Sequence, residues 1–340
     1  MGYPSLTAPR LTPSRYRAGL FLSALMAVGA IGLGLVVGTV PLDPSAVLAR
    51  DGVDWTILAH VRTPRVLLAA IVGAALATAG AALQPTLRNP LASPDIIGVS
   101  GGAALAAVLG LAFLPLGRGG AYFVPMVAFA GAAVSSAVVY RLSLVRGRLD
   151  PYTQILVGVI FNTFAASLIL LVHAVVDMTR SNSIVFWLMG GISVHPYPVL
   201  AMVFVLVVAG CAVLARESRT LDLIALGDEP AEHLGVDLNA SRTRVFAASA
   251  LLVGAVVSLT GVITFVGLIV PHVLRRLLGS DNRLLLPAAF FGGATFLVAC
   301  DALARFIVAP AELPVGAITA MAGGPFFIYL LRRRSVSGEV

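Results

Sequence analysis

The chain has 340 residues, of which 59% are hydrophobic and 11% are charged, and its formal net charge is +7. Soluble domains carry about 25% charged residues, so this composition excludes an ordinary water-soluble globule and indicates a chain surrounded by membrane lipid. All 23 basic residues are arginine, which excludes a Walker A nucleotide site because that loop needs a lysine on the phosphates.

The arginines are scattered between apolar runs instead of being clustered with aromatic residues. Membrane orientation therefore explains the positive charge better than nucleic-acid binding, and no nucleic-acid partner is expected. Cys211 and Cys300 each stand alone in an apolar run without the spacing of a metal site. We interpret both as small core residues and expect no bound metal.

A basic polar segment, residues 1–17, opens the chain and precedes an apolar run from Ala18 to Val40. The hydrophobic region of a cleaved signal peptide has about 7–15 residues. This longer run therefore predicts an uncleaved first span, with residues 1–17 as a cytoplasmic tail.

The second apolar run, residues 64–87, is rich in glycine and alanine and ends in Asn-Pro and Ser-Pro breaks. In lipid, helices associate through close backbone approach, so small residues line their contacts. Gly73, Ala77 and Gly80 form such a stripe and predict a helix–helix contact. The breaks free backbone groups that must be satisfied within protein or in a wet cavity.

Polar residues interrupt the fifth apolar run, residues 152–176, at Gln154, Asn162 and Thr163. Polar groups within a span are costly and usually face a cavity or a partner helix. Asn162 is the best candidate for lining a pathway, and an interhelical hydrogen bond explains it equally well. His173, near the end of the same run, is interpreted as an interfacial side chain and not as a ligand.

A long polar loop, residues 217–244, follows the sixth run and contains the stretch GDEPAEHLG. An acidic residue near a helix start, proline in the first turn and glycine at the end are the marks of a short capped helix. The loop is therefore expected to present a short helix.

One short element, VGLIVPHVLRRLL at 266–278, is too broken to assign from hydropathy alone. If it counts as a span and the N-terminus is inside, most arginines lie in the cytoplasm, as the positive-inside rule requires; if not, the basic C-terminus faces outward. The sequence therefore predicts an all-α polytopic membrane protein with one transmembrane domain, residues 18–334, and a cytoplasmic tail, residues 335–340. The ten predicted spans are 18–40, 64–87, 96–116, 122–145, 152–176, 199–214, 245–265, 266–278, 284–306 and 315–331.

Arg62, Arg65 and Arg305 lie at outer span ends in this topology, on a face that is otherwise poor in arginine. Bidentate pairing between arginine and carboxylate suits the docking of an acidic partner. The alternatives are snorkelling of the arginine side chains to the membrane interface, or local neutralisation, because Asp301 and Arg305 are i,i+4 neighbours.

An internal repeat is indicated by two pairs of matching stretches. GAALATAG at 73–80 resembles GAVVSLTG at 254–261, and PMVAFAGA from Pro125 resembles PAAFFGGA from Pro287. Their order predicts a duplicated unit, spans two to five and seven to ten. Because the copies begin five spans apart, they are inverted relative to each other, which is typical of transporters. Chance similarity between small-residue helices is the alternative.

Taken together, these stretches resemble the permease subunits of type II ABC importers, which carry iron–siderophores, haem and cobalamin across the bacterial inner membrane. The matching motifs run in family order from about residue 60 to the C-terminus. They are RTPR (62–65), GAALATAGAALQPTLRNPLASPDIIGVSGGAAL (73–105), FWLMGG (186–191), LIALGDEPAEHLGV (223–236), GVITFVGLIVPHVLRRLLG (261–279) and ELPVGAITAMAGGPFFIYLL (312–331).

The resemblance implies a homodimer of ten-helix subunits around one central path, with two cytosolic ATPase subunits that hold ATP–Mg and a periplasmic binding protein that docks outside. It implies that Arg62, Arg65 and Arg305 receive the binding protein and that Gln154, Asn162 and Thr163 line the path. It also implies a coupling helix that contacts the ATPase through Leu226, Gly227, Asp228, Glu229, Ala231, Leu234 and Gly235.

No nucleophile–base constellation and no HExxH spacing occur in the sequence, so we expect a transport subunit without an active site or a cofactor of its own. The alternatives are an ion-coupled secondary transporter, which usually needs a carboxylate in mid-span, and an ABC permease for an oxyanion such as molybdate. The sequence does not identify the cargo.

Overall fold

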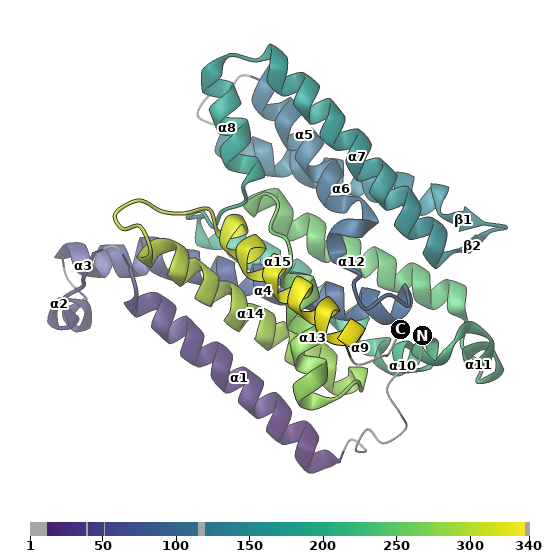
Figure 1. Ribbon diagram of the computed structural model, residues 1–340. Helices are drawn as coiled ribbons and strands as arrows, with labels where there is room; N and C mark the ends of the chain where they lie inside the picture. Colours follow the sequence, from purple (N-terminus) through teal and green to yellow (C-terminus); the bar gives the residue numbers. More distant parts are fainter. Residues whose placement is uncertain (1–11, 39, 51, 115–119, 337–340) are drawn as a thin grey trace.

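The computed structural model describes residues 12–38, 40–50, 52–114 and 120–336 (Figure 1). Within these ranges the regular structure is helical apart from one antiparallel pair of two-residue strands. The elements are α1 (Pro13–Val36), α2 (Pro44–Ala49), α3 (Gly52–Ile57), η1 (Leu58–Arg62), α4 (Thr63–Thr86), η2 (Pro94–Ile97), α5 (Val99–Phe113), α6 (Gly120–Leu142), β1 (Leu144–Val145), β2 (Arg148–Leu149), α7 (Pro151–Val175), α8 (Met178–Leu188), α9 (Tyr197–Arg216), α10 (Ser218–Leu226), α11 (Asp228–His233), α12 (Leu238–Thr260), α13 (Val266–Leu278), α14 (Asn282–Phe306) and α15 (Val315–Val336).

Seven helices in the described part of the chain are long and apolar enough to cross a membrane, and each of the ten predicted windows contains a helix. Of the helices in these ten windows, α5, α13 and α15 fall below the length or the apolarity that such a span needs. The first helix begins at Pro13, so part of the expected tail 1–17 is helical. Residues 1–11 and 337–340, which make up most of the two expected tails, lie outside the described residues.

Helix α4 runs through the centre of the bundle and is buried along almost its whole length (Figure 1). It packs against α14, α13, α12 and α9. A Cβ added at Gly73 would collide with the backbone carbonyl of Gly293 on α14, and one at Gly80 with that of Gly267 on α13. The predicted small-residue contact is therefore confirmed, because only glycine lets these backbones approach so closely.

In the two pairs of stretches that suggested an internal repeat, each stretch contacts a member of the other pair that lies in the opposite half of the chain. Helix α4 packs on α14, and α12 packs on α6. In the second contact a Cβ at Gly254 would lie 3.2 Å from the Cβ of Ala132. The short helices α5 and α13 both begin after a residue in the left-handed conformation, Gly98 with φ +79° and Phe265 with φ +68°. Each stretch of the first half thus packs against a stretch of the second half.

Aspartates mark the beginning of several helices. Asp150 caps α7 by accepting hydrogen bonds from the backbone N and the hydroxyl of Thr153, both at 2.7 Å. These bonds favour the carboxylate and lower the pKa of Asp150. Pro151 at the first helical position adds a preset φ, so the start of α7 is determined locally.

Candidate functional site

The polar loop folds into two short helices, α10 and α11, which together we call the polar loop unit. Gly227, with φ +135°, turns the chain between them. Ile224 of α10, Ala231 of α11 and Leu238 at the start of α12 are buried against one another. This small apolar cluster holds the unit against the bundle, and the expected short helix is therefore confirmed as α11.

One face of the polar loop unit is left exposed. Leu226 and Leu234, at the two ends of α11, are 63% and 62% exposed. Glu229 between them is also exposed. These three side chains are therefore accessible to another chain.

The seven predicted contact residues separate into three groups. Leu226, Glu229, Leu234 and Gly235 are exposed, and Gly227 and Asp228 are half-buried. Ala231 is fully buried in the apolar cluster, so the expectation that it meets another chain is corrected. A small side chain is needed there because α11 lies directly on α10 and α12.

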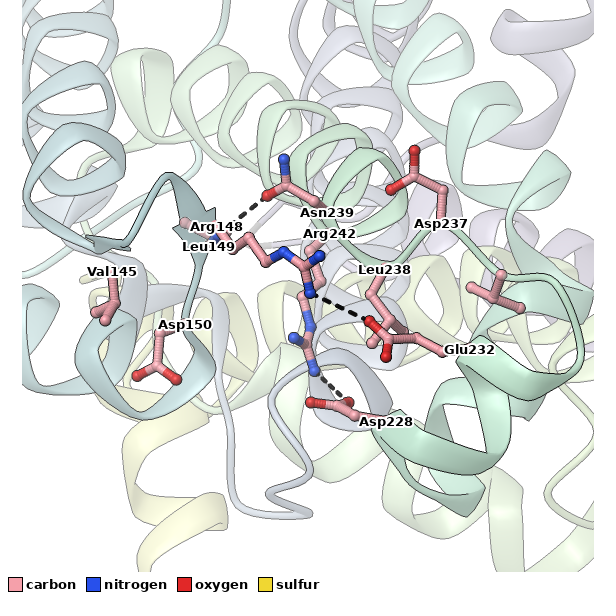
Figure 2. A pocket seen from close by; sticks show the side chains of 11 residues that line it. Val145, Arg148, Leu149, Asp150, Asp228, Glu232, Asp237, Leu238, Asn239 and Arg242 are labelled. Carbon is pink, nitrogen blue, oxygen red and sulfur yellow. Dashed lines mark hydrogen bonds and ion pairs between the residues drawn. The ribbon is translucent and has the colours of Figure 1, made fainter.

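Ion pairs connect α11 to other parts of the chain. Asp228 accepts a hydrogen bond from Arg242 of α12 at 2.6 Å and another from Arg88, which follows α4. Glu232 pairs with Arg148 of the β hairpin at 3.3 Å. Figure 2 shows Asp228, Arg242, Glu232 and Arg148 around a pocket of about 620 Å³ between the hairpin, α11 and the start of α12.

A second link leads from α10 to α14. Asp222 accepts hydrogen bonds from the backbone N of Asn282 at 2.9 Å and from its Nδ2 at 2.7 Å. Burial raises the pKa of Asp222 to about 6, and the nearby Asp281 contributes in the same direction. Nothing in the sequence pattern indicated this link, because its two ends are 60 residues apart.

The arginine cluster at the other end of α4 consists of Arg62, Arg65, Arg305, Asp301 and Glu312. Arg65 pairs with Asp301 at 2.9 Å and with Glu312 at 2.6 Å, and Arg305 pairs with Asp301 at 3.0 Å. Arg62 and Arg305 also donate hydrogen bonds to backbone carbonyls at the end of α1 and just after it. The acceptors of Arg62 are Leu35, Val36 and Val40, and those of Arg305 are Gly34 and Val37.

All three arginines are buried, with no more than 9% of any of them exposed. The structure brings them together as the sequence suggested, but their guanidinium groups are used within the chain. This agrees with the alternative of local neutralisation for Arg65 and Arg305, and the docking of a partner at the three arginines stays a prediction. Of the five side chains only Glu312 is substantially exposed, at 46%.

The three predicted path residues on α7 point in different directions. Gln154 is buried at 1% exposure, whereas Thr163 is exposed and donates to the carbonyl of Val159 in its own helix. The Nδ2 of Asn162 donates to the carbonyl of Asp95 in η2 at 2.7 Å. This is the hydrogen bond to another helical segment that was expected from the sequence as the alternative role of Asn162. The three residues do not form one surface.

Comparison with known proteins identifies the family. The sequence profile of the FecCD transport family matches residues 22–333. The chain belongs to this family. The resemblance predicted from the motifs is thereby confirmed, and the chain is the permease component of an ABC importer, as are its relatives in the family.

Several relatives match over nearly their whole length. The hemin transport system permease protein HmuU of Yersinia pestis is 36% identical, over 93% of this chain and 94% of its own. The vitamin B12 import system permease protein BtuC of Vibrio cholerae is 40% identical, over 93% and 92%. The Fe(3+)-citrate import system permease protein YfmD of Bacillus subtilis is 36% identical, over 94% and 96%.

A solved structure agrees with the fold. It is an inward-facing conformation of a "metal-chelate type ABC transporter", and it matches with a TM-score of 0.81 and 32% identity over 93% of this chain and 99% of the other. A chain of PsaBC from Streptococcus pneumoniae shares the fold at a TM-score of 0.54 and 15% identity. The helical architecture described above is therefore that of a known transporter fold.

Proposed function

We propose that this chain moves a metal chelate, such as an iron–siderophore, haem or cobalamin, across the inner membrane by using ATP that is hydrolysed in separate subunits. The observation that carries the proposal is the match to relatives named for hemin, vitamin B12 and ferric citrate over more than nine-tenths of the chain. The exposed face of the polar loop unit supplies the surface that a separate motor needs.

The proposed topology has ten spans, with both termini in the cytoplasm and the two halves inverted. The exchanged contacts, α4 on α14 and α12 on α6, support the inverted repeat, because a two-fold axis in the membrane plane produces such pairs. The short helices α5 and α13 then count as spans that belong to equivalent positions. With this orientation the polar loop unit lies in the cytoplasm and the arginine cluster lies outside.

Three protein partners follow from the proposal. Two ATPase subunits contact Leu226, Gly227, Asp228, Glu229, Leu234 and Gly235 of the polar loop unit. A second copy of this chain covers the exposed apolar side of α7, which includes Leu156, Ile160 and Phe164, and Thr163 and Asn162 then lie near the central path with Gln154 behind them. A periplasmic binding protein docks outside.

In this proposal the arginine cluster supports docking without contacting the binding protein through its guanidinium groups. Arg62, Arg65 and Arg305 hold the end of α1 and the segment between α14 and α15, and thereby shape the outer surface. Glu312 is the member of the cluster that reaches this surface. A binding protein would then recognise the shape that the arginines maintain.

Reconstitution tests the proposal. The chain is placed in proteoliposomes with its cognate ATPase and binding protein, and uptake of radiolabelled ferric citrate, haemin, cyanocobalamin and molybdate is measured with and without ATP. We expect ATP-dependent uptake of one chelate and none of molybdate. Uptake that follows an ion gradient without the ATPase would support a secondary transporter, and uptake of molybdate alone would support the oxyanion alternative.

A further inference from the structure

The end of α4 has an arginine at a position where glycine is usual. The backbone N of Asn89 donates to the carbonyl of Gln84 at 3.1 Å, and that of Arg88 donates to the carbonyl of Pro85 at 3.2 Å. This is the hydrogen-bond pattern of a Schellman motif, in which the residue after the helix takes the left-handed conformation. Arg88 takes it with φ +48°. A residue with a Cβ is strained there, and glycine is not.

The side chain of Arg88 bonds to a carboxylate of the polar loop unit. Its guanidinium donates to Asp228 at the start of α11. The same carboxylate accepts from Arg242, whose side chain is 8% exposed and belongs to α12. Asp228 therefore joins α11 to the end of α4 and to the beginning of α12, and it is the point at which three segments meet.

Arg146 provides a contrast within the same chain. It also takes the left-handed conformation, with φ +52°, and Gly147 follows it with φ +78°. Two successive left-handed residues form the usual tight turn of a hairpin, so the turn explains this strain. Arg146 is exposed and forms no ion pair with the residues that the structure describes. Arg50, the third left-handed arginine among the described residues, has φ +54° and lies over the ring of Trp55 in the neighbouring α3. Of these three arginines, Arg88 is the one that joins two distant segments.

We infer that Arg88 is a positioning residue that ties the connection between α4 and α5, residues 87–98, to α11. The inference rests on the proposed function, in which α11 is the contact with the motor. A displacement of α11 then moves the inner end of α4 directly. Because α4 is packed along its length against α12, α13 and α14, this movement reaches the helices on both sides of the bundle. Strain is tolerated at Arg88 because the link needs its guanidinium.

Distances between spin labels test the inference in the full-length chain in lipid nanodiscs. The labels are attached at Leu91→Cys and Glu229→Cys, two exposed positions on the two sides of the link, with Cys211 and Cys300 replaced by alanine. The variants are Arg88→Gly, Arg88→Lys and, as the matched control, Arg146→Gly. We expect a narrow distance distribution for the parent, Arg88→Lys and Arg146→Gly, and one about twice as wide for Arg88→Gly, because the loop then opens independently.

Thermal unfolding shows whether Arg88 positions α11, as inferred, or only adds to the overall stability of the chain. In Arg88→Gly the relief of backbone strain offsets the loss of a half-exposed ion pair, so the melting temperature is expected to stay unchanged. A distribution for Arg88→Gly as narrow as the parent's, or an equal broadening in Arg146→Gly, would overturn the inference.

The unlabelled parent chain with the ATPase and ATP–vanadate reports on the proposed function separately, because a label at position 229 would itself disturb the exposed face of the polar loop unit. Failure of this unlabelled chain to bind the ATPase contradicts the motor contact. The nanodisc result without the ATPase still decides whether Arg88 holds the two segments together.

Discussion

The polar loop unit and the arginine cluster lie at opposite ends of α4, and both are held by pairs of arginine and aspartate or glutamate. In the arginine cluster Asp301 is completely buried between Arg65 and Arg305. In the polar loop unit Asp228 and Arg88 each keep about two-fifths of their side chains exposed. Buried pairs are costly to separate, whereas exposed pairs are exchanged easily with water.

This difference assigns the two ends different mechanical roles. The arginine cluster fixes the end of α1 and the segment between α14 and α15 to α4, and every arginine in it has at least two partners within the chain. The polar loop unit is joined by a buried apolar cluster and by the buried Arg242, and in addition by exposed pairs that can be re-formed after a movement. The structure thus has a firm end and an adjustable end on the same central helix.

The largest effect is expected from breaking the firm end. Asp301→Ala leaves Arg65 and Arg305 as neighbouring buried cations without their shared carboxylate, and removal of one partner from a buried pair costs about 3–5 kcal/mol. We expect loss of a folded chain or a large fall in melting temperature in nanodiscs. The control is Glu312→Ala, which removes the half-exposed carboxylate of the same cluster. Equal stability of the two variants would contradict the proposed firm end.

A second large effect is expected at the exposed face of the adjustable end. Leu226 and Leu234 each contribute about 1.5–3 kcal/mol if they become buried against the ATPase, so Leu226→Ser with Leu234→Ser should weaken co-purification of the ATPase by more than tenfold. Neither residue is buried in the chain alone, so its melting temperature should not change.

The matched control for this pair is Leu48→Ser, because Leu48 is 84% exposed on α2, at the other end of the molecule. It removes an exposed leucine without touching the polar loop unit. Undiminished recovery of the ATPase with the double variant would show that the motor binds elsewhere.

The helices and the two charged regions at the ends of α4 could be predicted from the sequence. Which of the two regions is buried and which is exposed could not. The bilayer fixes the length of a span, so hydropathy located nine helix-bearing windows, and the positive-inside rule added the tenth, residues 266–278. Glycine spacing on α4 predicted its close contacts, because in lipid only small residues allow them. The short helix in the polar loop followed from its capping residues.

The partners of charged residues were beyond local reasoning. Arg65 meets Glu312 across 247 positions, and Arg88 meets Asp228 across 140. Position at a span end indicated that the arginines matter, but whether they point outward or into the bundle depends on which carbonyls and carboxylates the tertiary fold leaves unpaired. For the same reason the sequence could not decide whether Asn162 forms an interhelical hydrogen bond or lines a pathway. Its bond to the carbonyl of Asp95 joins α7 to η2, and no sequence spacing predicts that these two elements are neighbours.

The smallest and most specific effect is expected at Asp222, which joins the adjustable end to α14. Its pKa in the folded chain, about 6, lies above the ordinary 3.8, so the ionised carboxylate opposes folding. This penalty is fully present above pH 6 and disappears as the pH falls towards 4. Asp222→Asn keeps an oxygen that can accept both hydrogen bonds from Asn282 and removes the charge. We therefore expect this variant to melt above the parent at pH 8 and to lose that advantage as the pH falls towards 4.

The matched control is Asp281→Asn, because Arg283 lowers the pKa of Asp281 by hydrogen bonding, so there the charge supports the fold. That variant should melt below the parent at pH 8, and its deficit should shrink as the pH falls. If Asp222→Asn melts below the parent at pH 8, the hydrogen bonds from Asn282 outweigh burial, and the link to α14 is held by an ionised carboxylate. Every carboxylate that joins the polar loop unit to the rest of the chain would then be ionised at pH 8. The ease with which these links are re-formed would then depend only on how far their side chains are exposed to water.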